Sequence, residues 1–310
     1  ENGMYWLTGS QQFHLMKNVS ESLAGRVGIV NLNSFMYSEI KRNTSKVLFD
    51  PLNLKKAEKI DVNELYELIY KGGMPALYKD SNIDSNIYFQ GYLDTYISRD
   101  VRELTEVGNV DSFKKFIVSV ASRTGEQLNY SALANDAGIS VPTAKSWLSI
   151  LTSTGLVYLL EPYMSSELKR ITHIPKIIFM DTGLACFLAG WDSPRELQLS
   201  SSSGHYLETY VVSEIIKSYN ARGIRPNLSY YRDKDKNEID LIFYKNNTLY
   251  PFEIKKMASP NKTMIKNFGL LSKINKKVGT GGIICLYDDL MHLDENNYII
   301  PVSSVINGKD

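Results

Sequence analysis

The stretch Glu238-Ile-Asp-Leu-Ile-Phe-Tyr-Lys-Asn-Asn-Thr-Leu-Tyr-Pro-Phe-Glu-Ile-Lys255 carries the clearest structural signal in the chain. Its apolar runs predict two neighbouring strands, Glu238–Tyr244 and Thr248–Lys255. Side chains alternate between the two faces of a strand, so Glu253 and Lys255 point to one side and their apolar neighbours point into the core. The pattern therefore predicts that Asp240 and a Glu-x-Lys pair meet at one edge of a sheet.

Further elements on either side of this stretch complete a known order. A helix and a strand are predicted before it, and a basic helix and a last strand after it: Tyr206–Tyr219, Leu228–Tyr231, Asn261–Lys273 and Gly282–Tyr287. Helix, three strands, helix and strand is the αβββαβ order of the restriction-endonuclease-like core. We therefore predict this core within a domain of residues 186–310.

Such a core would bring together groups suited to Mg²⁺ chemistry. Asp240 and Glu253, with a backbone carbonyl, can hold one Mg²⁺ that keeps several waters, and Glu208 on the preceding helix is a further candidate metal ligand. The metal would polarise a phosphoryl oxygen and make water a better nucleophile. Lys255 would stabilise charge on the phosphate or orient the water, so Asp240, Glu253 and Lys255 are the predicted catalytic residues. Cross-strand ion pairs on exposed strands, such as Lys255 with Asp240, would explain the same pattern.

Local charge favours a polyanionic partner for this region. The whole chain is nearly balanced, with 35 Lys and Arg against 34 Asp and Glu, so it has no chain-wide basic field. Between Tyr231 and Thr280, however, eleven basic residues stand against five acidic ones. Lys256, Lys262 and Lys266 are therefore predicted contacts to a nucleic-acid backbone. A solvated lysine-rich helix face is the alternative.

The middle of the chain predicts a winged helix-turn-helix over residues 111–185. Two amphipathic helices lead to a third helix, which Ser140 caps and which has Pro142 in its first turn. Two extended segments follow, with a polar loop between them. The first two helices and the two extended segments are Ser112–Ser122, Tyr130–Ala137, Leu156–Pro162 and Lys176–Met180.

This winged helix supplies candidate nucleic-acid contacts. Its third helix would present Thr143, Lys145 and Ser146 outward, and the loop between the extended segments would present Lys169 and Arg170. Groups of these types touch phosphates and base edges. Only one lysine lies in the helix itself, and a winged helix can also serve as a packing module or a dimer contact.

The first residues have the order of a parallel sheet. Met4–Leu7 predicts a strand, Gln11–Leu23 a helix and Val27–Asn31 a second strand. A parallel sheet needs several strands and covered faces. We therefore expect the rest of this sheet to lie upstream of Glu1 or in another chain.

Three short motifs resemble a bacterial and archaeal group of AAA-type ATPases: Thr8-Gly9-Ser10-Gln11-Gln12, Ser22-Leu23-Ala24-Gly25-Arg26 and Ser38-Glu39. The resemblance implies an ATPase remnant over residues 1–60, a helical lid over 61–110 and a C-terminal domain of unknown function after the winged helix. It also implies Ser10 as a sensor of the nucleotide phosphate and Arg26 as a basic residue near the nucleotide. An ordinary strand-to-helix turn capped by Ser10 is the alternative.

The same resemblance limits what this chain can do with ATP. The phosphate loop G-x-x-x-x-G-K-S/T occurs nowhere in the 310 residues, and the family's acidic metal-binding strand would also precede Glu1. Without that loop the chain should not hydrolyse ATP. The intact protein is expected to bind ATP, whereas this chain is expected to bind or act on nucleic acid.

Composition favours a globular protein of a reducing compartment. Hydrophobic residues make up 43% of the chain, enough for a conventional core. The two cysteines, Cys186 and Cys285, can form neither a disulfide framework nor a four-ligand zinc site. No apolar run has the length of a membrane span and no signal peptide opens the chain, so we expect a cytoplasmic location. Three functions stay open: a Mg²⁺-dependent nuclease, a non-catalytic nucleic-acid binder, and a scaffold for a protein partner or a second copy of the chain.

Overall fold

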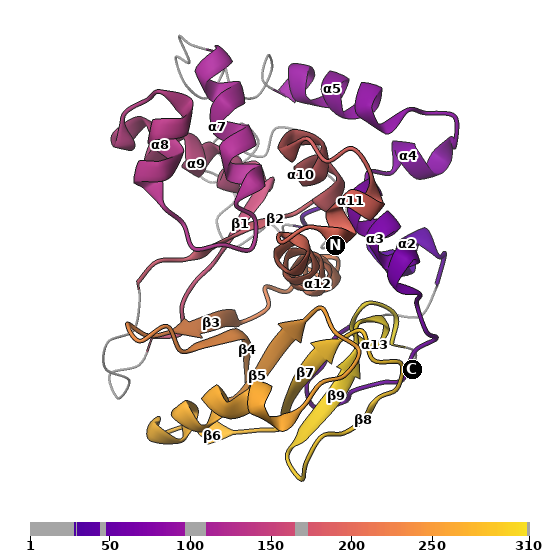
Figure 1. The fold of residues 1–310 in the computed structure, drawn as a ribbon, viewed down its shortest axis with the longest axis vertical. Coiled ribbons are helices and arrows are strands. Elements are labelled where there is room, and N and C mark those ends of the chain that lie inside the picture. Colours follow the sequence, from indigo (N-terminus) through magenta and orange to yellow (C-terminus); the bar gives the residue numbers. More distant parts are fainter. Residues whose placement is uncertain (1–27, 29, 44–47, 97–109, 165–172, 309–310) are drawn as a thin grey trace, which may run out of the picture.

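The computed structural model describes residues 28, 30–43, 48–96, 110–164 and 173–308 (Figure 1). These residues form a mixed α/β fold with a two-stranded sheet, a seven-stranded sheet and helices around both. None of the helices in these ranges is long and apolar enough to span a membrane.

In the view of Figure 1, most of the helices lie above the large sheet. The α-helices are α2 (Tyr37–Ile40), α3 (Val62–Lys71), α4 (Ala76–Lys79), α5 (Ser85–Tyr96), α7 (Val110–Ser122), α8 (Tyr130–Ala137), α9 (Val141–Ser153), α10 (Thr182–Ala189), α11 (Pro194–Leu199), α12 (Ser203–Asn220) and α13 (Val302–Asn307). A 3₁₀ helix, η2, spans Lys262–Lys273. The strands are β1 (Val157–Leu160), β2 (Lys176–Phe179), β3 (Leu228–Arg232), β4 (Glu238–Lys245), β5 (Thr248–Lys255), β6 (Lys277–Val278), β7 (Gly281–Cys285), β8 (Met291–His292) and β9 (Asn297–Pro301).

The helices α7, α8 and α9 and the strands β1 and β2 form a helix–hairpin unit. The side chains of Asn129 and Ser140 accept hydrogen bonds from backbone N–H groups in the first turns of α8 and α9, which fixes where these helices begin. Gly138 ends α8 in the left-handed conformation, at φ 64°. β1 and β2 pair antiparallel. The helices and extended segments predicted here are confirmed as elements.

The large sheet has the strand order β3-β4-β5-β7-β9-β8, with β6 beside β5. β3, β4 and β5 are antiparallel, β5, β7 and β9 are parallel, and β8 is antiparallel at the far edge. Apolar side chains of α12 pack on one face of the sheet and those of η2 on the other. The central strands are therefore buried on both faces, as their long apolar runs require.

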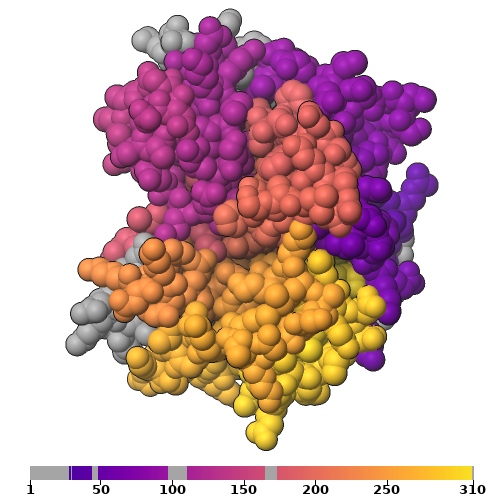
Figure 2. Space-filling view, viewed as in Figure 1, coloured from indigo at the N-terminus to yellow at the C-terminus, as the bar shows by residue number. Residues whose placement is uncertain are grey.

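One continuous apolar core joins α3, the helix–hairpin unit, α10, α12 and one face of the large sheet. Polar contacts reinforce the join: Thr124 Oγ1 lies 2.9 Å from Thr209 Oγ1, and the backbone of Tyr230 on β3 bonds to Glu161 and Tyr163. Figure 2 shows the magenta segment in the upper part of the molecule and the orange-to-yellow segment in the lower part, with the salmon-coloured segment beside the magenta one. The domain boundaries predicted near residues 60, 110 and 185 stay predictions.

The end of helix α3 lies close to the start of helix α10 in space, and two glycines permit this close approach. A Cβ on Gly183 would lie 2.4 Å from the carbonyl oxygen of Lys71. Gly72 adopts φ +70°, and a Cβ there would lie 2.3 Å from Oδ1 of Asp181. Asp181 caps α10 and also accepts a hydrogen bond from the backbone N–H of Gly73, at 3.0 Å.

Two predicted elements need correction. The strand predicted over Val27–Asn31 is wrong for residues 28, 30 and 31, which are exposed and have no regular secondary structure. Apolar alternation favours a strand only where a neighbouring strand can pair with it. The helix predicted over Asn261–Lys273 is a 3₁₀ helix from Lys262, with Asn261 as its N-cap. The other N-terminal elements, Met4–Leu7 and Gln11–Leu23, lie outside the described residues.

Candidate functional site

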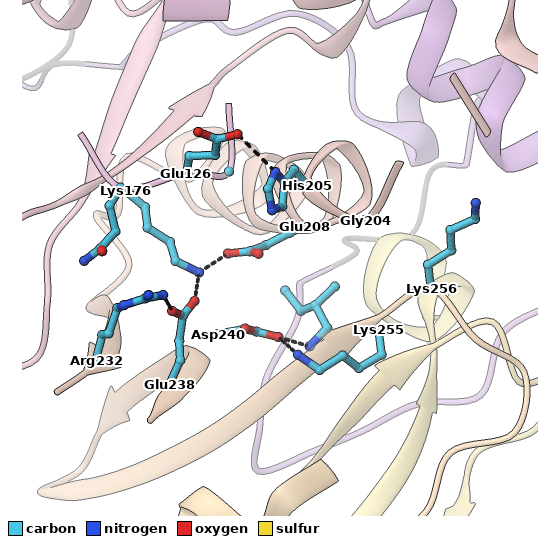
Figure 3. Close-up of a pocket in the computed structure, with 13 residues that line it drawn as sticks. Glu126, Lys176, Gly204, His205, Glu208, Arg232, Glu238, Asp240, Lys255 and Lys256 are labelled. Carbon is cyan, nitrogen blue, oxygen red and sulfur yellow. Dashed lines mark hydrogen bonds and ion pairs between the residues drawn. The ribbon is translucent and has the colours of Figure 1, made fainter. Parts of the chain in front are cut away.

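A pocket of about 510 Å³ opens at the end of the large sheet where β3 and β5 finish and β4 begins (Figure 3). Its lining comes from the loop after α7, the start of β2, the first turns of α12 and the strand ends. The lining residues are Gly125, Glu126, Gln127, Lys176, Gly204, His205, Glu208, Arg232, Glu238, Asp240, Ile254, Lys255 and Lys256. The pocket therefore lies where the helix–hairpin unit meets the sheet.

A β-bulge in β4 positions Asp240. The pairing of β3 with β4 shifts by one residue between Ser229 and Tyr231, which leaves Asp240 and Leu241 opposite a single residue of β3. Ile239 and Leu241 are both fully buried, although they lie two positions apart across the bulge and contribute to opposite faces of the sheet. The bulge thus lets Asp240 line the pocket while apolar residues on both sides of it stay in the core.

The structure brings Asp240, Glu253 and Lys255 together. Lys255 Nζ lies 2.7 Å from Asp240 Oδ2 and 2.7 Å from Glu253 Oε2. The backbone N–H of Ile254 also donates to Asp240 Oδ2, at 2.8 Å. Asp240 is 6% exposed and Glu253 3% exposed, and Glu253 Oε1 has no hydrogen-bond partner in the described part of the chain. The ion pair weighed as an alternative is present, but on buried carboxylates rather than on exposed strands.

Burial and mutual repulsion drive the pKa values of these two carboxyl groups apart. Burial, and next the negative charge of Asp240, raise the pKa of Glu253 to about 9, against the opposing effect of Lys255. Burial acts on Asp240 in the same direction, but Lys176 and Lys255 outweigh it and hold the pKa of Asp240 below its usual value. At neutral pH the pair therefore retains one proton, on Glu253.

A second charge cluster surrounds Lys176, the first residue of β2. Its Nζ lies 2.7 Å from Glu208 Oε1 and 2.6 Å from Glu238 Oε1, and 5.1 Å from the ring centroid of Tyr230. Arg232 contacts the other oxygen of Glu238 (Figure 3). Lys176 is only 2% exposed, so this ammonium group is held almost entirely by protein.

The pKa values in this second cluster follow from burial and charge. Burial alone would lower the pKa of Lys176, but the charges of Glu208, Asp240 and Glu238 outweigh it and raise that pKa. Burial raises the pKa of Glu208 to about 7, with Lys176 opposing. Perturbed groups gathered around one pocket are typical of functional sites.

The opposite side of the pocket is a fixed loop that carries Glu126. Gly125 donates its backbone N–H to Ile177 at 2.7 Å, and Ile177 donates back to Glu126 at 2.9 Å. Gly125 has φ +81°, and a Cβ there would lie 2.9 Å from the Cβ of His205. His205 Nδ1 lies 3.5 Å from Glu126 Oε1 across this contact. The glycine therefore lets the loop touch the first turn of α12.

The three predicted metal ligands do not form one cluster. Among the residues that the structure describes, no three His, Cys, Asp or Glu side chains are arranged to hold a metal ion. Glu208 is bound to Lys176, whereas Asp240 and Glu253 share Lys255. The acidic pair on β4 and β5 is what remains of the predicted ligand set.

The side chains predicted to contact nucleic acid differ in how exposed they are. Lys145 and Ser146 are exposed on α9 and Thr143 is partly exposed. Lys262 and Lys266 are exposed on η2. Four further predicted site residues lie outside the described ranges: Ser10, Arg26, Lys169 and Arg170.

Lys256 differs from this expectation because the protein itself holds its ammonium group. Lys256 Nζ donates to the backbone oxygen of Gln198 and to Ser203 Oγ, the latter at 2.9 Å. It also lies 5.3 Å from the ring centroid of Tyr66. Burial, and next the charge of Arg195, lower the pKa of Lys256. Its contacts fix the loop after β5 against α11 and α12.

Several pocket residues were missed from the sequence. Lys176 opens an apolar strand, and a lysine that begins a fully buried run is a signal for a buried counter-ion. Arg232 and Glu238 flank the β3–β4 turn, where their pairing across the strands follows once the register is known. His205 gave no signal, because its partner Glu126 lies 79 positions away.

Fold and site together define a mixed α/β protein with a buried carboxylate pair and a shared lysine at the end of a sheet. Residues 62–195 match a domain of unknown function, DUF8612, and residues 203–305 match a second one, DUF4143. The second match includes α12 and all strands of the large sheet, and therefore Asp240, Glu253 and Lys255.

The chain is also similar to uncharacterized proteins of Mycobacterium bovis and Mycobacterium tuberculosis. Each is 27% identical over 259 residues, which is 83% of this chain and 53% of the relative. The chain therefore spans about half the length of these relatives.

Proposed function

We propose that the C-terminal sheet carries a Mg²⁺-dependent phosphodiesterase site that acts on nucleic acid. The observation that carries the proposal is the convergence of Asp240 and Glu253 on Lys255 Nζ, 2.7 Å from each, beside a pocket of about 510 Å³. Two acidic groups and a lysine in this arrangement suit phosphoryl transfer, where positioning and charge stabilisation do most of the work.

The acidic pair fits a hard divalent cation. Glu253 Oε1 is buried without a hydrogen-bond partner in the described chain, and repulsion from Asp240 contributes to the raised pKa of Glu253. Mg²⁺ needs only one or two carboxylates beside waters and substrate oxygens. When bound between Asp240 and Glu253, it would supply Lewis-acid polarisation of a phosphoryl oxygen.

Two lysines of the protein would complete the proposed site. Lys255 now contacts both carboxyl groups, and its partly exposed side chain would turn from them to a phosphate oxygen. Lys176 keeps Glu208 and Glu238 in place and favours the ionised form of Asp240. The site thus holds the Asp240 carboxylate and the Lys255 ammonium group side by side.

The proposal includes two finer fold assignments. For the elements α12, β3, β4, β5, η2 and β7 we propose a restriction-endonuclease-like core, and for α7, α8, α9, β1 and β2 a winged helix. Exposed Lys145 and Ser146 on α9 would contact the nucleic-acid backbone. ATP binding through an AAA-type domain is proposed only for a longer protein that carries a phosphate loop.

Cleavage assays test the proposal. The whole chain is incubated with labelled single-stranded and duplex DNA and RNA in Mg²⁺, Mn²⁺ or EDTA. We expect metal-dependent cleavage that Asp240→Asn lowers by about 100-fold or more. Asp94→Asn, which breaks an exposed ion pair with Lys114 on the surface of the helices, is the control and should keep full activity. Cleavage that survives in Asp240→Asn or in EDTA would overturn the proposal.

A non-catalytic nucleic-acid binder is the second candidate. The observation that favours it is Lys255 itself, because its ammonium group already compensates the acidic pair. Salt-sensitive retention of DNA without cleavage, weakened by Lys145→Ala and unchanged by Asp240→Asn, would support this alternative.

A further inference from the structure

The pocket contains a pair of ionisable groups that the proposed metal site does not use. His205, in the first turn of α12, lies with Nδ1 3.5 Å from Oε1 of Glu126. Both residues line the same pocket as Asp240 and Lys255. Figure 3 shows the imidazole between the Glu126 carboxylate and the rest of the pocket.

The orientation of the ring leaves one nitrogen available. Nδ1 faces Glu126, so Nε2 lies on the opposite side of the ring, and no described residue bonds to it. The close contact of Gly125 with His205 fixes the loop against the helix and keeps Glu126 beside the ring. A carboxylate beside one ring nitrogen orients a histidine.

We infer that His205 is the proton donor to the leaving oxygen of the phosphodiester, with Glu126 as its positioning residue. This inference rests on the proposed phosphodiesterase function. The remaining cations of the pocket are poor candidates: Lys176 is held by Glu208 and Glu238, and lysine and arginine give up a proton reluctantly near neutral pH. Imidazole is the side chain suited to proton transfer there.

The step is a balanced hydrolysis. The oxygen of one water forms a new bond to phosphorus, and the bond from phosphorus to the leaving sugar oxygen breaks. The electron pair of that bond stays on the sugar oxygen, which takes the proton from His205 Nε2. The proton that the attacking water loses passes to solvent, and His205 regains a proton from solvent, so no further reactant is needed.

Stability does not explain the Glu126–His205 pair. Their side chains are 45% and 47% exposed, and ion pairs this exposed contribute little to folding. Substitution of either residue should therefore leave the fold intact, which makes the inference open to a kinetic test.

The test compares two leaving groups. Wild type, His205→Ala, His205→Gln and Glu126→Gln are assayed on single-stranded DNA and on thymidine 5′-(p-nitrophenyl phosphate), whose nitrophenolate leaves without a proton. His205→Ala and His205→Gln should slow DNA cleavage about 100-fold and change the nitrophenyl reaction less than about 3-fold. Glu126→Gln should slow DNA cleavage about 10-fold. His292→Ala, at an exposed histidine on β8 at the other edge of the sheet, is the matched control and should change neither rate.

The outcomes separate this inference from the proposed function. Equal losses on both substrates in the His205 variants, or an unchanged rate on DNA, would overturn the role of His205 as proton donor. Asp240→Asn should silence both substrates, because the metal site serves both reactions. A wild-type protein that cleaves neither substrate would overturn the phosphodiesterase proposal and this inference with it.

Discussion

Lys176 neutralises two buried carboxylates from a strand of the helix–hairpin unit. Its Nζ lies within 2.7 Å of both Glu208 and Glu238, and its side chain is 3% exposed. Removing one partner of a buried ion pair leaves the other charge uncompensated in a region that excludes water. Lys176 therefore links the two sheets through charge as well as through packing.

Lys176→Met should lower the free energy of unfolding by about 3–5 kcal/mol, measured by urea denaturation. Lys41→Met is the control, because it breaks a pair with Glu64 in which both side chains are at least 40% exposed, and it should cause no measurable loss. A Lys176→Met protein as stable as wild type would show that Glu208 and Glu238 do not depend on this charge.

Glu253 makes stability depend on pH in a predictable direction. The folded protein raises its pKa from 4.5 to about 9, so between these values the folded state binds a proton that the unfolded state has lost. Stability therefore falls as pH rises through this window in metal-free buffer, by up to about 1.4 kcal/mol per pH unit. Glu253→Gln removes the titrating group and should flatten the curve of unfolding free energy between pH 6 and 9. Parallel curves for the two proteins would contradict the buried, protonated carboxyl.

The sequence predicted some of these residues well and others not at all. Glu253 and Lys255 could be predicted because alternation along one strand sets their side, whereas the position of Asp240 also depends on the bulge in β4. Glu126 and His205 could not, because only the fold brings a loop after α7 to the first turn of α12. The contacts of Lys256 with Gln198 and Ser203 could not be predicted either, since a basic residue in a basic segment gives no sign of a buried partner.

At the scale of elements, the contact between α3 and α10 depends on the absence of side chains. Gly183→Ala would place a Cβ 2.4 Å from the carbonyl oxygen of Lys71, a contact that backbone can relieve only by moving. We expect a loss of about 1–3 kcal/mol in the free energy of unfolding. Gly91→Ala in α5, where a Cβ meets nothing within 4 Å, should instead be neutral or stabilising by up to about 1 kcal/mol. Equal unfolding free energies of the two variants in urea would contradict a tight contact between α3 and α10.

The elements show where sequence patterns are reliable. The starts of α8 and α9 follow from Asn129 and Ser140, because caps are local chemistry. The bulge at Asp240 does not follow from the sequence, because it is a property of the pairing between β3 and β4. η2 ends where the predicted helix ends and begins one residue later, but the sequence pattern did not distinguish a 3₁₀ helix from an α-helix.

At the scale of the whole molecule, a continuous core implies joint unfolding of the helix–hairpin unit and the sheet. Phe116 of α7 and Phe252 of β5 are both fully buried in the same apolar cluster. Phe116→Ala and Phe252→Ala should each lower one shared thermal transition, by about 3–5 kcal/mol in unfolding free energy. Calorimetry that resolves two transitions, each sensitive to only one variant, would show two independent domains.

The pocket has the same dependence on the whole molecule. Its residues come from the loop after α7, from β2, from α12 and from three strands of the sheet. Either unit alone would supply only part of the lining. Function is therefore best measured on the full chain.

In the proposed site, Asp240 and Glu253 share one divalent cation. Calorimetric titration of the full chain with Mg²⁺ at pH 6 and at pH 8.5 tests it most directly. We expect a single site that binds more tightly at the higher pH, with release of a proton from Glu253, and no binding by Asp240→Asn. Absence of binding by the wild type at both pH values, or equal binding by Asp240→Asn, would contradict it.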